Sequence, residues 1–102
     1  MSKKDQFKFV LAVALSHATD ARKHHEEGHP RAGIIEVFET QKGVEWAVLG
    51  ARPDYLETCD GWKFIADAVK NLIDAVLAAD DERDARRQLI NDFCEKYVWS
   101  AE

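Results

Sequence analysis

The segment before Gly28 contains no glycine or proline, and its apolar residues recur at the three- and four-residue spacing of an α-helix. Ser2, followed three residues later by Asp5, resembles a capping box with Asp in place of the usual Glu, so the helix is predicted to begin there. Gly28 and Pro30 mark its end, because glycine tolerates left-handed backbone geometry and proline cannot continue the hydrogen-bond ladder. The pattern predicts one long N-terminal helix. Its main apolar stripe consists of Phe7, Val10, Leu11, Ala14, Ala18 and Ala21.

The first half of this helix also carries apolar residues outside that stripe. Phe9, Val13 and Leu15 place apolar surface on other faces, so this half needs cover on more than one side. Either the helix lies centrally between a sheet and other helices, or two copies of the chain pair along it. We expect a homodimer whose interface includes Phe7, Phe9 and Val13.

Two short runs after Pro30 are rich in β-branched and aromatic residues, over 34–40 and 44–50. The link between them supplies a turn, so the pattern predicts an antiparallel β-hairpin. A short third strand over 55–58 is an open alternative, because Pro53 and Asp54 interrupt the run just before it. The unpaired edges of a two-stranded hairpin also favour association of two copies.

Helical periodicity returns in the last part of the chain. Asp60 resembles an N-cap, and the apolar residues that follow keep the 3.6-residue period up to Ala79. The acidic cluster at 80–84 either starts a separate helix or forms a bend within one long helix, and both alternatives stay open. The final apolar stripe consists of Ala85, Leu89, Ile90, Phe93, Cys94 and Tyr97.

Length and composition agree with one globular domain over residues 1–102. The chain has a mass of 11.6 kDa and is 46% hydrophobic and 32% charged, which is typical of a folded domain rather than a disordered chain. Strands adjacent in sequence and covered by helices predict a two-layer α+β fold. The expected order of elements is α-β-β-α-α.

The net charge of −5 and a sequence pI near 5.3 disfavour nonspecific binding to nucleic acid or to acidic lipid surfaces. Acidic residues are concentrated over 53–82, whereas residues 83–102 are neutral overall. Part of this charge belongs to a solvated helix face with alternating Lys and Asp. The remainder is predicted to form an acidic rim that docks on a basic protein. The rim residues are Asp54, Glu57, Asp60, Asp80, Asp81 and Glu82.

The acidic rim, together with the absence of phosphate-loop, dinucleotide and nucleophile-elbow motifs, favours a non-enzymatic protein-binding function with no cofactor. The expected roles are an adaptor, an antitoxin or immunity protein, or a phage-type inhibitor of another macromolecule, such as a nucleic-acid-binding complex. Trp99 lies beyond the last apolar stripe, and with Arg52 it is a candidate contact point for the partner.

One alternative function rests on the segment His25-Glu26-Glu27-Gly28-His29, which matches the HExxH pattern of zinc hydrolases. In that pattern His25 and His29 would share the metal, and Glu26 would polarise the attacking water. However, Gly28 and Pro30 favour a chain that leaves the helix before His29, so the two imidazoles need not face the same way. We therefore expect no metal site here.

A second alternative is a nucleic-acid-binding face on the last helix, formed by Arg83, Arg86 and Arg87. Acidic residues interleave with these arginines, so direct nucleic-acid binding is not the favoured interpretation.

Cysteine usage and hydropathy give the expected compartment. Cys59 and Cys94 are isolated from one another and lack CxxC spacing, which favours a reduced, cytoplasmic protein. The apolar run over 9–15 follows three lysines and resembles part of a secretory signal, but Asp5 interrupts the charged region. We interpret this run as part of a buried helix.

Overall fold

The computed structural model describes residues 2–28, 30–79 and 82–99, and within these ranges only the backbone is described for 21–26, 30–34, 36 and 59. The described residues form four α-helices and one short 3-10 helix, with no strand among them. These elements are α1 (Lys3–Glu26), α2 (Pro30–Ala51), η1 (Pro53–Glu57), α3 (Cys59–Ala79) and α4 (Arg83–Tyr97).

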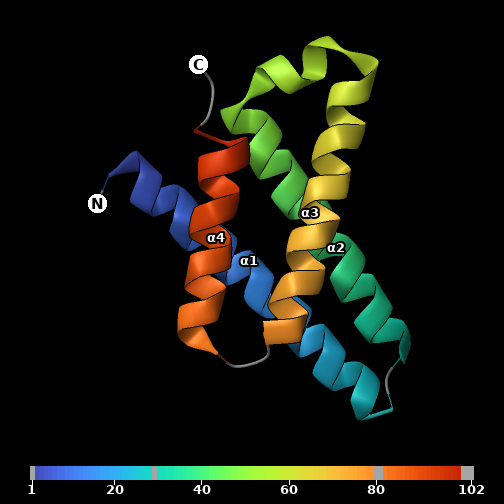
Figure 1. The fold of residues 1–102 in the computed structure, drawn as a ribbon. Coiled ribbons are helices and arrows are strands. Elements are labelled where there is room, and N and C mark those ends of the chain that lie inside the picture. The colour runs from blue at the N-terminus through green and yellow to red at the C-terminus, as the bar shows by residue number, and fades with distance from the viewer. Residues whose placement is uncertain (1, 29, 80–81, 100–102) are drawn as a thin grey trace.

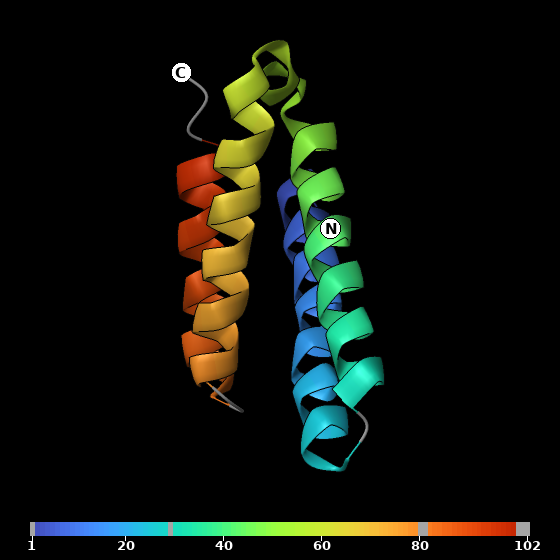
Figure 2. The same cartoon turned by 90° about the vertical axis from the view of Figure 1, so that its right-hand side faces the viewer.

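The helices are arranged as two antiparallel pairs that form two layers. Helices α1 and α2 make one layer and α3 and α4 make the other, with η1 joining the layers at one end (Figures 1 and 2). An apolar core fills the space between them, as expected for helices that each bury one stripe. Its buried side chains come from all four helices and include Leu11, Leu15, Val44, Val48, Ile65, Val69, Val76, Ile90 and Phe93.

The predicted β-hairpin is wrong, because residues 34–40 and 44–50 belong to the continuous helix α2. The predicted α+β class and its α-β-β-α-α order are therefore also wrong, and the fold is all-helical. Val44, Trp46 and Val48 are among the β-branched and aromatic residues that predict the second strand, but Trp46 is 58% exposed while Glu45 and Leu49 are buried beside the two valines. Burial at successive three- and four-residue steps is the pattern of a helix. Tertiary packing has overridden the β propensity of these residues.

The third strand considered over 55–58 is likewise wrong. Residues Pro53–Glu57 form η1, with Pro53 at its start, and Thr58 then adopts the extended backbone that leads into α3. Proline suits the first turn of a helix because its missing N–H would have no intrahelical partner there.

The ends of the other helices follow local signals. The backbone N–H of Asp5 donates to Ser2 Oγ at 3.1 Å, which confirms the predicted cap at the start of α1. Gly28 has φ of 91°, a left-handed conformation that glycine adopts at little cost after the end of a helix.

The start of α3 differs by two residues from the prediction. Thr58, not Asp60, caps this helix, because Thr58 Oγ1 accepts a hydrogen bond from the N–H of Gly61 at 3.1 Å. Asp60 lies in the first turn instead. Helix α3 ends at Ala79 and α4 begins at Arg83, so the last part of the chain forms two helices rather than one.

No helix among the described residues combines the length and the apolar character needed to cross a bilayer.

Candidate functional site

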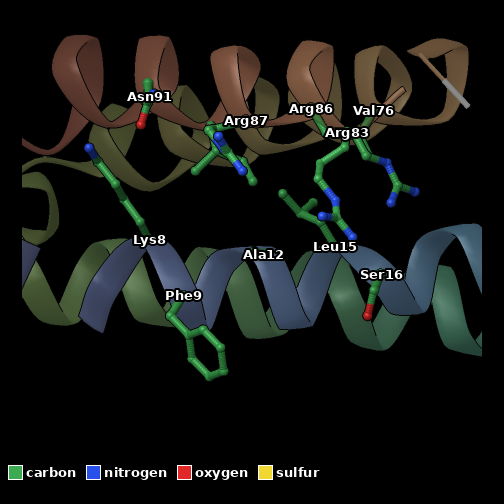
Figure 3. A pocket seen from close by; sticks show the side chains of 11 residues that line it. Lys8, Phe9, Ala12, Leu15, Ser16, Val76, Arg83, Arg86, Arg87 and Asn91 are labelled. Atoms are coloured by element: carbon green, nitrogen blue, oxygen red, sulfur yellow. The ribbon is translucent and has the colours of Figure 1, made fainter. Parts of the chain in front are cut away.

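A cleft of about 840 Å³ lies between α1 and α4, with α3 at its back. Figure 3 shows α1 and α4 running side by side, with side chains from both helices directed into the space between them. The cleft is open to solvent. Its lining residues are Lys8, Phe9, Ala12, Leu15 and Ser16 from α1, Val76 from α3, and Arg83, Arg86, Arg87, Ile90 and Asn91 from α4.

The floor of the cleft is apolar, because it is lined by Leu15, Val76 and Ile90 of the buried core. The walls are basic. Four cationic side chains line the cleft, and no carboxylate is among the described lining residues. A low-dielectric floor beside several cations concentrates positive potential in the cleft, although the whole chain carries a net charge of −5.

Helical spacing explains how α4 becomes basic on one side. Arg83, Arg86 and Arg87 are three and four residues apart, so they share one face of the helix. The interleaved acids Asp84 and Asp92 are exposed and do not line the cleft. A segment that is neutral by residue count is therefore polarised in three dimensions.

Arg86 also links the two walls. Its Nη2 atom donates a hydrogen bond to Thr19 Oγ1 on α1. Its buried Nε has no acceptor among the described residues. An unsatisfied buried donor costs about 1–3 kcal/mol, so this Arg86 nitrogen reduces the stability of the wall that it belongs to.

Lys8 stands on the opposite wall, where it is also close to Trp99. The Lys8 amine lies 5.2 Å from the centroid of the Trp99 indole, and Lys4 lies 4.8 Å from the same ring. The indole packs against the core and is half-buried. Trp99 therefore folds back onto α1 through cation–π contacts.

Arg52, the other half of the predicted contact point, is held at the C-terminus of α4. Its Nη1 lies 3.4 Å from the carbonyl oxygens of both Tyr97 and Val98, and its other nitrogens form a bidentate pair with Asp54 at 2.6 and 2.8 Å. The hydrogen bond from Arg52 lowers the pKa of Asp54 below its usual value. Arg52 thus satisfies terminal carbonyls of α4, a structural role that the sequence alone did not indicate.

The predicted acidic rim is divided between the two ends of α3. Asp54, Glu57 and Asp60 are exposed near η1, whereas Glu82 follows the far end of α3. A helix of this length spans about 30 Å, so Glu82 cannot share a patch with the other three. Asp80 and Asp81 lie outside the described residues.

The zinc-hydrolase alternative falls on positions that the structure describes incompletely. His29 and the side chains of His25 and Glu26 lie outside the described residues, and α1 ends at Glu26. Among the residues whose side chains are described, no group of three His, Cys, Asp or Glu residues is placed to hold a metal ion.

The predicted dimer surface divides between the core and the exterior. Phe7 is half-buried against the core, whereas Phe9 and Val13 are 61% and 46% exposed. Phe9 also stands at the edge of the cleft, with its ring directed away from α4 in Figure 3. The homodimer itself stays a prediction.

Cys94 on α4 is fully buried, and this burial raises its pKa from 9.0 to about 11. The unfolded chain then releases the thiol proton near pH 9 while the folded chain retains it, so the thiol's contribution to stability is complete below pH 9 and is lost as pH rises toward 11. We expect the difference in unfolding free energy between the wild-type protein and Cys94→Ala to shrink across this interval, as measured by urea denaturation at several pH values. A difference that stays constant would contradict the burial of this thiol.

The sequence pattern does not predict the cleft, because Arg83, Arg86 and Arg87 indicate a nucleic-acid-binding face and Phe9 indicates a dimer interface. Lys8 and the apolar floor come from segments distant in sequence, and no local motif connects them to α4. Comparisons of the chain with protein-family models, with curated proteins and with solved structures find no match.

Proposed function

We propose that this protein is a non-enzymatic protein-binding domain that holds a negatively charged segment of its partner in the cleft between α1 and α4. One observation carries the proposal: Lys8, Arg83, Arg86 and Arg87 surround a cleft with an apolar floor and no described carboxylate. Such a surface pairs best with a ligand that supplies both negative charge and apolar contact. We also propose that the protein acts in the reducing cytoplasm, because its two cysteines are isolated and lack CxxC spacing.

The cleft replaces the acidic rim as the docking surface. Among the described rim residues, Glu82 is separated from Asp54, Glu57 and Asp60 by the length of α3, and Asp54 is already paired with Arg52. The cleft instead gathers its charges from two helices around one concave, partly apolar surface, and concave sites with few convergent polar groups are where ligands bind. The partner is therefore expected to be acidic where it meets this protein, rather than basic.

Binding of nucleic acid through Arg83, Arg86 and Arg87 is the competing interpretation. These arginines do share a face, but they surround an apolar floor on which phosphates would gain nothing. The net charge of −5 also repels an extended polyanion beyond the edges of the cleft. An acidic protein segment, which carries apolar side chains beside its carboxylates, matches both parts of the surface.

The proposal is tested by titrating 15N-labelled protein with a short polyglutamate peptide at low salt. We expect amide shifts to concentrate on the cleft segments of α1 and α4. The double variant Arg83→Glu/Arg87→Glu should weaken binding by about tenfold or more, since it removes two cations and adds two acids to one wall. Raising the salt concentration should weaken binding to the wild-type protein, because the contacts are electrostatic and exposed on one side.

A matched control is the double variant Lys63→Glu/Lys70→Glu on α3, which alters the net charge by the same amount at exposed positions away from the cleft. It should weaken binding by less than about threefold, which is the loss that the change in net charge alone would cause. Equal losses in both variants, or no binding of the peptide to the wild-type protein, would overturn the proposal. A short DNA duplex that binds more tightly than the peptide would overturn it in favour of a nucleic-acid-binding module.

A further inference from the structure

We infer that the segment held in the cleft is an amphipathic α-helix with an apolar stripe between two rows of carboxylates. The inference rests on the proposed function and specifies the form of the partner. It follows from the length of the cleft, from its opening to solvent, and from how the four cations are distributed around its floor.

The length of the cleft corresponds to about two turns of helix. Its α1 wall runs from Lys8 to Ser16 and its α4 wall from Arg83 to Asn91. At 1.5 Å per residue, each wall is about 12 Å long. A helix that lies along these walls would bury residues at i, i+3, i+4 and i+7, the usual set of anchors in a helix-binding groove.

The opening of the cleft indicates that only one face of such a helix is covered. The cleft is open to solvent, so the outer face of the ligand remains in water, while its inner face meets the apolar floor. A ligand with one apolar and one polar face satisfies both conditions.

The cations are distributed along the cleft rather than directed at one point. In Figure 3, Lys8 lies at the end of the cleft that Asn91 marks, Arg83 lies toward the end that Ser16 marks, and Arg87 lies between them. A single carboxylate or phosphate headgroup would contact only one of these positions. Several negative charges along the length of the ligand are needed to contact them all.

The two walls also place cations on both sides of the floor. Lys8 belongs to the α1 wall, and Arg83 and Arg87 belong to the α4 wall, with Leu15 and Ile90 between them. A bound helix would therefore direct its apolar stripe at the floor and carry Glu or Asp on each side of that stripe. This arrangement excludes a uniformly acidic coil as the preferred ligand, because such a coil leaves the floor uncovered.

The test compares two synthetic peptides of the same composition and about 14 residues, built from Leu, Glu and Ala. One places its leucines at i, i+3, i+4 and i+7 with glutamates on either side, and the other has the same residues in scrambled order. We expect the patterned peptide to bind at least about tenfold more tightly and to gain helical far-UV circular dichroism on binding, because only it covers the apolar floor.

The variant Ala12→Trp tests the site itself, because Ala12 is exposed and lines the cleft, so a larger side chain there fills the channel without entering the core. It should weaken binding of the patterned peptide by about tenfold. The matched variant Ala78→Trp, at an exposed position on α3 outside the cleft lining, should leave binding unchanged. Urea denaturation of both variants shows whether each remains folded.

The outcomes separate this inference from the proposed function. If the two peptides bind the cleft equally, the helical partner is wrong while the acidic partner stands. If neither they nor polyglutamate bind, both proposals are wrong. Dodecanoate provides a further test, because it combines an apolar chain with a single carboxylate. If it displaces the patterned peptide at a concentration below the peptide's own Kd, the inference is wrong and the ligand is an amphiphile with a single headgroup.

Discussion

Gly61→Ala is expected to destabilise the protein by about 3 kcal/mol or more, because the added methyl group has no space. A Cβ at this position would lie 1.8 Å from the carbonyl oxygen of Tyr55 and 2.7 Å from its carbonyl carbon. Both atoms belong to the backbone of η1, so they cannot move as a side chain would. The close approach of α3 to η1 requires a residue without Cβ.

The damage should extend beyond the contact itself. The Tyr55 hydroxyl donates a hydrogen bond to the carbonyl oxygen of Tyr97 at 2.6 Å, and Arg52, one residue before η1, reaches the same carbonyl. A displaced η1 therefore releases the C-terminus of α4. Urea denaturation and thermal unfolding should both show the loss, with Tm falling by about 10 °C or more for a chain of this size.

Gly43→Ala is the matched control, since Gly43 lies within α2 and nothing stands within 4 Å of an added Cβ. It should stabilise the protein by about 0.5–1 kcal/mol, because alanine loses less backbone freedom in a helix than glycine does. This result also tests the helix itself, because a hairpin turn at this position would not gain from alanine. A destabilised Gly43→Ala protein would contradict the structure of α2.

Leu11→Ala should lower the unfolding free energy by about 2–5 kcal/mol, the usual cost of the cavity left by a buried leucine. Leu11 is fully buried on the face of α1 that meets the core. A typical domain has an unfolding free energy of about 5–15 kcal/mol, so this loss would be a large fraction of the total stability. Urea denaturation with an unchanged m-value would show that stability, and not the extent of unfolding, has been altered.

Val13→Ala on the same helix provides the comparison, because Val13 is 46% exposed. Its effect should remain within about 0.5 kcal/mol, since the methyl groups removed already contact water. Both variants should be measured at several protein concentrations. A loss at Val13 that approaches the loss at Leu11 and grows with concentration would show that a second copy covers this face, as the predicted homodimer requires.

The parts of the fold that could be read from the sequence are those set by local chemistry. Ser2, Gly28 and Pro30 placed the ends of the first helix correctly, because caps and helix terminators act within a few residues. The apolar periodicity up to Ala79 located α3 for the same reason. The common face of the α4 arginines also follows from spacing alone.

The parts that could not be read depend on contacts between distant segments. Val44, Trp46 and Val48 alternate as in a strand, and only the burial of Glu45 and Leu49 beside the valines identifies the helical face. Glu45 illustrates why the pattern misled, since this charged residue is buried and its Oε1 accepts a hydrogen bond at 2.9 Å from the indole N–H of Trp62 on α3. A buried carboxylate with a tertiary partner breaks the rule that polar positions face solvent.

By itself, the sequence determined where α1 and α3 lie and that three arginines share one face of the last helix, because periodicity and capping are properties of neighbouring residues. The tertiary structure decided that residues 34–50 form a helix and that Lys8 faces those arginines across an apolar floor. Both outcomes arise when segments far apart in the chain pack together, and the free energy of that packing exceeds the small local preferences that favour one conformation over another.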